Sequence, residues 1–76
     1  MDLKPSIVRF LKEKYAAEVA ENESLFERGC LDSMALLELL GFIEERMGVR
    51  VPDSEVLPEN FETIANIDAL VKRLQS

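Results

Sequence analysis

The stretch GCLDSMALLELL, residues 29–40 of this 76-residue chain, decides how the rest of the sequence is interpreted. A polar loop ends at Asp32, and apolar residues at helical spacing begin directly after Ser33. Aspartate is a favoured N-cap residue, and Gly48 is the kind of residue that ends a helix in the left-handed conformation. The sequence therefore predicts a helix from Ser33 to Met47, capped by Asp32.

The position of Ser33 gives its hydroxyl group a particular environment. Backbone N–H groups in the first turn of a helix have no intrahelical acceptor, and the helix dipole is positive at this end. A phosphate ester on Ser33 would lie where a helix N-terminus favours negative charge. We interpret Ser33 as the attachment point of a phosphate-linked group and not as a catalytic nucleophile.

The helix predicted over residues 33–47 has two different apolar lines. One has the spacing of a core face and consists of Leu36, Leu39, Leu40, Ile43 and Met47. The other line lies away from the core face and consists of Met34, Leu37 and Gly41. The acidic residues near it are Glu38, Glu44 and Glu45. Exposed apolar side chains among acids near Ser33 predict a partner-contact strip. The alternative is that they only widen the core face.

Two further helices follow from the same spacing rule. Residues 2–17 place Leu3, Ile7, Phe10 and Leu11 on one face, with Asp2 as the expected N-cap and Pro5 in the first turn. The last helix begins at Thr63 or Ile64 and ends at Leu74. A long connection, residues 18–31, separates the first two helices, and we expect its apolar residues to pack on the bundle: Val19, Leu25, Phe26 and Leu31.

The segment between Gly48 and the last helix contains one short element. Asp53 is expected to cap a helix of a turn or two that Pro58 ends, followed by an irregular corner at residues 60–63 around Phe61. The predicted fold is all-α: a small four-helix bundle with three longer helices, one short third helix and a long loop between the first and second. Residues 1–76 are expected to form a single domain.

The charge of the chain limits the classes of molecule that it can bind. The net charge is −6, and residues 21–62 carry eleven acids against three arginines, a local charge of −8. Nucleic acid is excluded, because a phosphate backbone selects basic faces. Basic patches on proteins complement this charge, whereas a merely solvated acidic surface is the alternative.

The sequence also bears on the cellular compartment and the oligomeric state of the protein. No apolar run approaches the ~20 residues needed to span a bilayer, and no secretory signal is recognisable. Cys30 is the single cysteine, so an internal disulfide is excluded. We interpret Cys30 as a small, partly buried apolar residue. We expect a cytoplasmic monomer.

The residues needed for most catalytic sites are missing. The chain has no histidine, so neither a Ser-His-Asp nor a Cys-His nucleophile can form within it. It also lacks the ligands for a zinc site, the calcium-loop spacing and a Gly-rich phosphate loop. The sequence therefore predicts a protein that is not an enzyme and binds no metal.

Leu31-Asp32-Ser33-Met34, at the start of an acidic and apolar helix, resembles the phosphopantetheine-attachment motif of acyl and peptidyl carrier proteins. The resemblance covers nearly the whole chain in length, helix order and acidic balance. It includes Leu25-Phe26 before the motif, Val51-Pro52-Asp53 after the helix, and the closing helix from Ile64 to Leu74.

The resemblance implies a function. In that family a phosphopantetheinyl transferase moves 4'-phosphopantetheine from coenzyme A onto the serine that corresponds to Ser33, and the arm carries acyl or aminoacyl thioesters between enzymes. Asp32 corresponds to the acid that supports the cap and recognition by the transferase. The matching positions for partner contacts are Met34, Leu37, Glu38, Gly41, Glu44 and Glu45. We expect an acyl groove at Leu36, Leu39 and Ile64.

Departures from the general pattern indicate a subtype. Met34, in place of leucine, and the segments 51–55 and 59–64 are more similar to D-alanyl and peptidyl carriers than to carriers of bulk fatty-acid synthesis. We expect a specialised free-standing carrier, loaded by an adenylate-forming ligase and unloaded by a synthase or acyltransferase. The alternative is an acidic helical adaptor, an interaction protein that never receives the arm.

Overall fold

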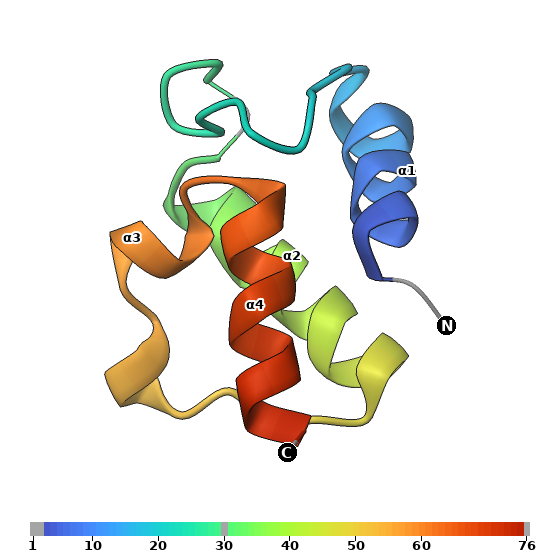
Figure 1. The fold of residues 1–76 in the computed structure, drawn as a ribbon. Helices are drawn as coiled ribbons and strands as arrows, with labels where there is room; N and C mark the ends of the chain where they lie inside the picture. The colour runs from blue at the N-terminus through green and yellow to red at the C-terminus, as the bar shows by residue number, and fades with distance from the viewer. Residues whose placement is uncertain (1–2, 30, 76) are drawn as a thin grey trace.

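The computed structural model describes residues 3–29 and 31–75, which form helices and loops and contain no strand. The α-helices are α1 (Leu3–Tyr15), α2 (Ser33–Met47), α3 (Pro58–Phe61) and α4 (Ile64–Gln75), and a 3-10 helix, η1, spans Asp53–Glu55. A long loop joins α1 to α2 across the top of the bundle in Figure 1. The predicted all-α bundle, with three longer helices and a short third one, is confirmed.

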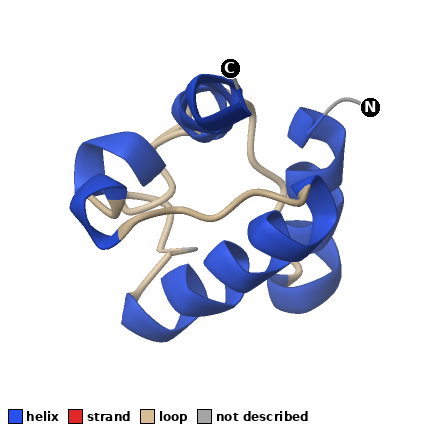
Figure 2. Ribbon diagram, turned by 90° about the horizontal axis from the view of Figure 1, so that it is seen from below, coloured by secondary structure: helices blue, strands red, loops and turns tan. Residues whose placement is uncertain are grey.

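The helices enclose one apolar core. α1 contacts both α2 and α4, and α3 packs on α4. Figure 2, viewed along α4, places α2 on the opposite side of the bundle from α4. Ten side chains with almost no exposed surface fill the space between them: Ile7, Leu11, Leu25, Leu39, Ile43, Phe61, Ile64, Ile67, Leu70 and Val71.

The core face of α2 differs in part from the predicted one. Leu39 and Ile43 are fully buried, as expected, but Leu36, Leu40 and Met47 are only half-buried and pack at the edge of the core. Ala35 is buried instead, one turn before Leu39. The face that points into the core is thus the line through residues 35, 39 and 43, which are spaced one turn apart.

The first helix is shorter than predicted. It ends at Tyr15 and not at Ala17, because Ala16 has a left-handed backbone with φ 53° and the Ala17 N–H donates to the Leu11 carbonyl at 3.4 Å. This is the arrangement that usually ends a helix at glycine, so a sequence with alanine here gives no sign of it. The expected N-cap, Asp2, lies outside the described residues.

The loop between α1 and α2 is anchored by three of the four predicted side chains. Val19, Leu25 and Leu31 are buried, whereas the prediction for Phe26 is wrong, since 38% of its surface is exposed. The turn at residues 24–29 is closed by backbone hydrogen bonds, and Leu25 alone occupies the buried position, so its neighbour Phe26 points outward. The interpretation of Cys30 falls outside the described residues.

Two backbone hydrogen bonds attach this loop to the corner between α3 and α4. The Leu25 N–H donates to the Glu62 carbonyl at 2.7 Å, and the Ala65 N–H donates to the Glu21 carbonyl at 3.0 Å. In Figure 1 the loop accordingly passes over the start of α4. The segment that leads into Ser33 is therefore held by the opposite end of the chain.

The short third helix lies later in the chain than predicted. Asp53 forms no side-chain cap, and η1 is only a three-residue 3-10 helix that follows Pro52. Pro58 begins α3 and does not end a helix, because proline at the first helical position lacks only an N–H that would be unpaired there anyway. The predicted irregular corner at residues 60–63 is wrong for Asn60 and Phe61, the last two residues of α3, and Phe61 is fully buried.

Candidate functional site

The N-terminus of α2 has the capped geometry that the sequence predicted. Asp32 has an extended backbone, with φ −119° and ψ −170°, and its side chain accepts a hydrogen bond from the Ala35 N–H at 2.8 Å. Its carbonyl accepts the first helical bond, from the Leu36 N–H, at 2.8 Å. At the other end, Gly48 has φ 65° and donates to the Glu44 carbonyl at 3.0 Å. The bounds of α2 are thus set by local signals at both ends.

Ser33 is the first residue of α2, and its side chain is exposed. It begins a 15-residue helix whose dipole is positive at this end, so negative charge on the serine oxygen is stabilised there. Exposure lets an enzyme reach the hydroxyl, and the fixed cap defines its direction. The residues present therefore fit a phosphate-linked group on Ser33.

A second Asp-Ser pair in the chain, Asp53-Ser54, provides an internal contrast. Both pairs are exposed and both begin a helical segment. Asp53 forms no cap, however, and η1 has three residues, too short to contribute an appreciable dipole. The dipeptide alone does not distinguish the two serines, but the helix that follows does.

Asp32→Ala tests the contribution of this cap to stability. We expect a loss of about 1 kcal/mol in the free energy of unfolding, because the Ala35 N–H loses its acceptor. For a domain of this size that is a fall of roughly 4–8 °C in Tm, measurable by circular dichroism. Asp53→Ala is the matched control and should leave Tm unchanged, since Asp53 caps nothing. Equal losses in both variants would contradict the assignment.

The predicted partner-contact strip lies on the exposed face of α2. Met34 and Leu37 expose 73% and 66% of their surface, so they do not simply widen the core face. Gly41 and Glu45 are also exposed. These large apolar side chains start directly after Ser33, and solvent-exposed residues of this kind mark interaction surfaces when they occur together.

Two acids of the predicted strip have contacts within the chain. The Glu44 carboxylate accepts a hydrogen bond from the Val51 N–H at 2.9 Å and so holds the segment after α2 against the helix. Glu38 forms an ion pair with Lys14 of α1 at 3.5 Å, with both side chains about half exposed. Exposed pairs of this kind contribute only ~0–1 kcal/mol, so Glu38 can exchange Lys14 for a cation on a partner. Neither contact was predicted from the sequence, because each joins residues from different segments of the chain.

Tyr15 links the end of α1 to the same region. Its hydroxyl is buried and has no hydrogen-bond partner among the described residues. Burial, followed by the negative charges of Glu38 and Asp32, raises the pKa of Tyr15 above its usual value. The Tyr15 phenol therefore stays neutral to a higher pH than an exposed tyrosine does.

The residues predicted to form an acyl groove belong to the core. Leu39 and Ile64 have no exposed surface, and Leu36 is half-buried at the edge. An acyl chain that contacted Leu39 and Ile64 would have to separate packed side chains, because protein interiors contain few voids. The groove stays a prediction.

Residues 3–29 and 31–75 contain no group of three or more His, Cys, Asp or Glu side chains placed to hold a metal ion. Within the same ranges, no helix is both long enough and apolar enough to cross a bilayer.

Comparison with known families identifies the family of this chain. Residues 4–74 match the family described as "Phosphopantetheine attachment site". This chain belongs to the phosphopantetheine-binding carrier proteins. Members of this family hold 4'-phosphopantetheine covalently, and its thiol, when present, supplies the thioester linkage that carries an acyl group.

Curated relatives of this carrier cover the chain almost from end to end. It is 33% identical over 78 residues to the D-alanyl carrier protein of Streptococcus sanguinis strain SK36, which covers 100% of this chain and 99% of the relative. The D-alanyl carrier protein of Streptococcus suis strain 05ZYH33 is 38% identical over 69 residues, covering 88% of this chain and 87% of the relative.

Solved structures agree with the fold. Two matches come from structures of Bradyrhizobium japonicum glycine:[carrier protein] ligase. The one with glycylated carrier protein has a TM-score of 0.73 and 28% identity, and covers 91% of this carrier and 99% of the matched chain. The one with cognate carrier protein and a glycyl-adenylate analogue has a TM-score of 0.75 and 27% identity, covering 95% and 99%.

A third match is a chain in a structure titled "Crystal structure of FAD-dependent dehydrogenase". Its TM-score is 0.73 and its identity 38%, and the alignment covers 87% of this carrier and 93% of that chain.

Proposed function

We propose that Ser33 is the residue to which this carrier attaches 4'-phosphopantetheine. The observation that supports this most strongly is the exposed Ser33 hydroxyl at the Asp32-capped N-terminus of α2. Asp32 fixes the backbone on the N-terminal side, and the 15 residues of α2 supply the positive end of a dipole to the phosphodiester. Residues 1–76 act in this proposal as one carrier domain, in which catalysis is left to the partner enzymes.

The cargo we propose is a small aminoacyl group, delivered by an adenylate-forming ligase. Support comes from the D-alanyl carrier relatives and from the similarity to chains in glycine:[carrier protein] ligase structures. Such a ligase would transfer the aminoacyl group from its adenylate to the thiol of the arm. An oxidation by a flavin enzyme is a second reaction class to test on the loaded cargo, because of the 38% identical chain in a structure titled for an FAD-dependent dehydrogenase.

The exposed strip on α2 is the surface that we propose the transferase and the ligase contact. Met34 and Leu37 supply the apolar contacts next to Ser33, while Gly41 permits close approach of a partner backbone and Glu45 adds negative charge. Glu38 joins them once Lys14 is displaced. Glu44 contributes by holding the segment at Val51 in place, in addition to its charge.

Leu37→Gln tests this surface. Because Leu37 is 66% exposed, the variant should keep the wild-type Tm, whereas the rate of aminoacyl transfer by the ligase should fall about tenfold, the effect of losing ~1.4 kcal/mol of contact. The measurement is the initial rate of loading by intact-protein mass spectrometry. Ala69→Gln, at an exposed position of α4, is the control and should load normally. An unchanged rate in Leu37→Gln would remove Leu37 from the contact surface.

The experiment that tests the carrier function has two steps. The protein is incubated with coenzyme A, Mg²⁺ and a promiscuous phosphopantetheinyl transferase, and its mass should rise by one phosphopantetheine. ATP, D-alanine or glycine, and the corresponding ligase should then add one aminoacyl group that hydroxylamine removes, as expected of a thioester. A folded protein that gains no mass from an active transferase would contradict the proposal and favour the acidic adaptor.

A further inference from the structure

A groove of about 720 Å³ lies between α1 and α2, and neither Ser33 nor a residue of the exposed strip lines it. We call it the α1–α2 groove. The residues that line it and matter here are Arg9, Phe10, Glu13, Lys14, Phe42 and Arg46. They come from the outward side of α1 and from the C-terminal half of α2.

The floor of the groove is aromatic. The rings of Phe10 and Phe42 lie 4.6 Å apart between centroids at an interplanar angle of 33°, and both are only half-buried. Tyr15 supports Phe10 from the side in an edge-on contact, with centroids 6.3 Å apart. Part of the ring surface of Phe10 and Phe42 thus remains in contact with water. Binding of an apolar side chain that covers this surface would be favourable.

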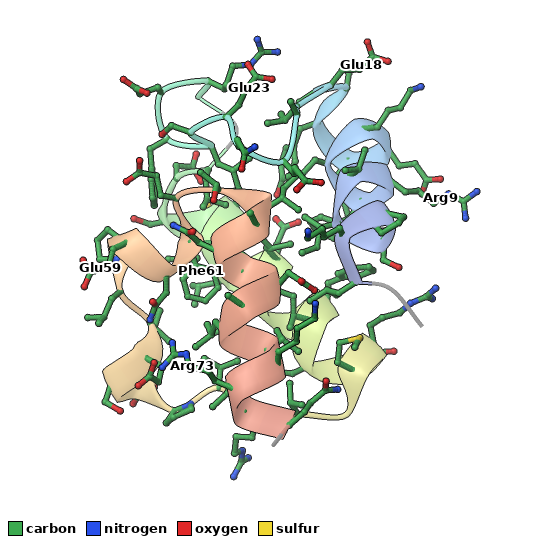
Figure 3. All side chains as sticks on the ribbon, viewed as in Figure 1. Arg9, Glu18, Glu23, Glu59, Phe61 and Arg73 are labelled. Carbon is green, nitrogen blue, oxygen red and sulfur yellow. The ribbon has the colours of Figure 1, made fainter. Side chains whose placement is uncertain are left out.

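The rim of the groove is basic, although the protein as a whole is acidic. Arg9, Lys14 and Arg46 surround the rings, against the carboxylate of Glu13, so the residues that line the groove sum to +2. Lys14 also pairs at 3.5 Å with Glu38, beside the groove, and an acidic ligand would compete with that exposed pair. Arg9 and Glu13 are 3.9 Å apart and both mostly exposed, so they are weakly paired; Figure 3 shows Arg9 projecting away from the bundle. Arg46 is exposed and forms no ion pair within the described part of the chain.

The groove is separated from the arm-bearing face by the geometry of α2. At 3.6 residues per turn, Phe42 lies roughly 80° and Arg46 roughly 120° around the helix from Met34. A molecule seated in the groove therefore leaves Ser33, Met34 and Leu37 accessible, and it meets the strip only through the Lys14–Glu38 ion pair. The two surfaces also have opposite charge, so they select different partners.

We propose that the α1–α2 groove binds an acidic peptide segment of a partner protein, with an aromatic or aliphatic side chain placed over Phe10 and Phe42. The carboxylates of the peptide lie on either side of that side chain and form ion pairs with Arg9, Lys14 and Arg46, which line the groove around the two rings. Arginine suits this role, because its guanidinium group binds carboxylates in two-point contacts. The groove serves as a tether that keeps a partner near the arm.

Shape and charge favour a peptide over an anionic membrane. A membrane surface extends well beyond the groove, and acids such as Glu38 and Glu45 on the neighbouring face of α2 would come within a Debye length, ~8–10 Å, of its lipid headgroups. The net charge of −6 adds to that repulsion. A short peptide stays within the groove and meets chiefly its local positive charge.

The test is an NMR titration of the ¹⁵N-labelled protein with the peptide acetyl-Glu-Asp-Phe-Leu-Asp-Glu-amide. We expect saturable amide shifts confined to residues 6–14 and 42–46, and weaker binding as salt rises. Arg9→Glu/Arg46→Glu should raise Kd by about tenfold or more, since two attractive contacts become repulsive. Arg50→Glu is the control, because Arg50 is exposed but does not line the groove, and it should raise Kd far less than half as much, on a logarithmic scale, as the double variant does.

Four results would overturn the proposal. They are equal binding of the uncharged analogue acetyl-Gln-Asn-Phe-Leu-Asn-Gln-amide, shifts centred on residues 33–41, no saturation, and binding to phosphatidylglycerol vesicles without binding to the peptide. Ser33→Ala should bind the peptide like wild type, because the groove does not involve the arm. Failure of this proposal is thereby distinguishable from failure of the carrier function.

Discussion

A Ser33→Ala variant is expected to gain no mass when it is incubated with coenzyme A, Mg²⁺ and a phosphopantetheinyl transferase that fully modifies the wild type. The phosphodiester needs an oxygen at this position, and alanine has none. The substitution removes only an exposed hydroxyl from the first turn of α2, so the fold should remain. Surface changes of this kind usually alter stability by no more than ~0.5 kcal/mol.

Ser54→Ala is the control that makes this result specific. It removes the hydroxyl from the other Asp-Ser pair, at the start of the three-residue η1, and it should be modified as fast as wild type. If Ser33→Ala still gained one phosphopantetheine while Ser54→Ala lost it, the attachment site would have been misassigned. If both variants were modified, neither of these serines would be the attachment point.

How far the sequence predicted the structure depended on whether a signal was local. The bounds of α2 were correct at both ends, because Asp32 and Gly48 determine a cap and a stop through their own backbone preferences. The same residues placed Ser33 at the helix N-terminus, so the geometry of the candidate site followed from a few adjacent positions. The exposure of Met34 and Leu37 followed from helical spacing alone.

Features that depend on residues far apart in the sequence were not predictable. Pro58 is compatible with either the end or the start of a helix. It starts α3, because the helix that follows it buries Phe61 between α3 and α4. The side chain of Asp68 is only 8% exposed and pairs with Lys72 at 3.0 Å, an environment that depends on how α4 packs in the fold. Glu44 likewise acquired its Val51 contact from the fold of the following segment.

Phe61→Ala is expected to have the largest effect on stability. Phe61 is fully buried and is the one side chain that fixes α3 in the core, between α3 and α4 (Figure 3). Replacing a buried phenylalanine by alanine costs about 3–5 kcal/mol. A domain of this size has a core worth only ~3–5 kcal/mol in net stability, so the variant should be largely unfolded at 25 °C. Thermal denaturation followed by circular dichroism measures this.

Leu57→Ala is the matched control, because Leu57 is a large apolar residue four positions earlier that is already 40% exposed, and its loss should cost much less. The loop before Ser33 is bonded to Glu62, the residue that follows Phe61. Loss of α3 packing should therefore also release the segment that presents Ser33 and slow its modification. Ser33→Ala removes the reacting oxygen from a folded protein. Phe61→Ala keeps this oxygen but disrupts the folded segment that positions it. Full modification of an unfolded Phe61→Ala would mean that the transferase recognises only the local sequence around Ser33.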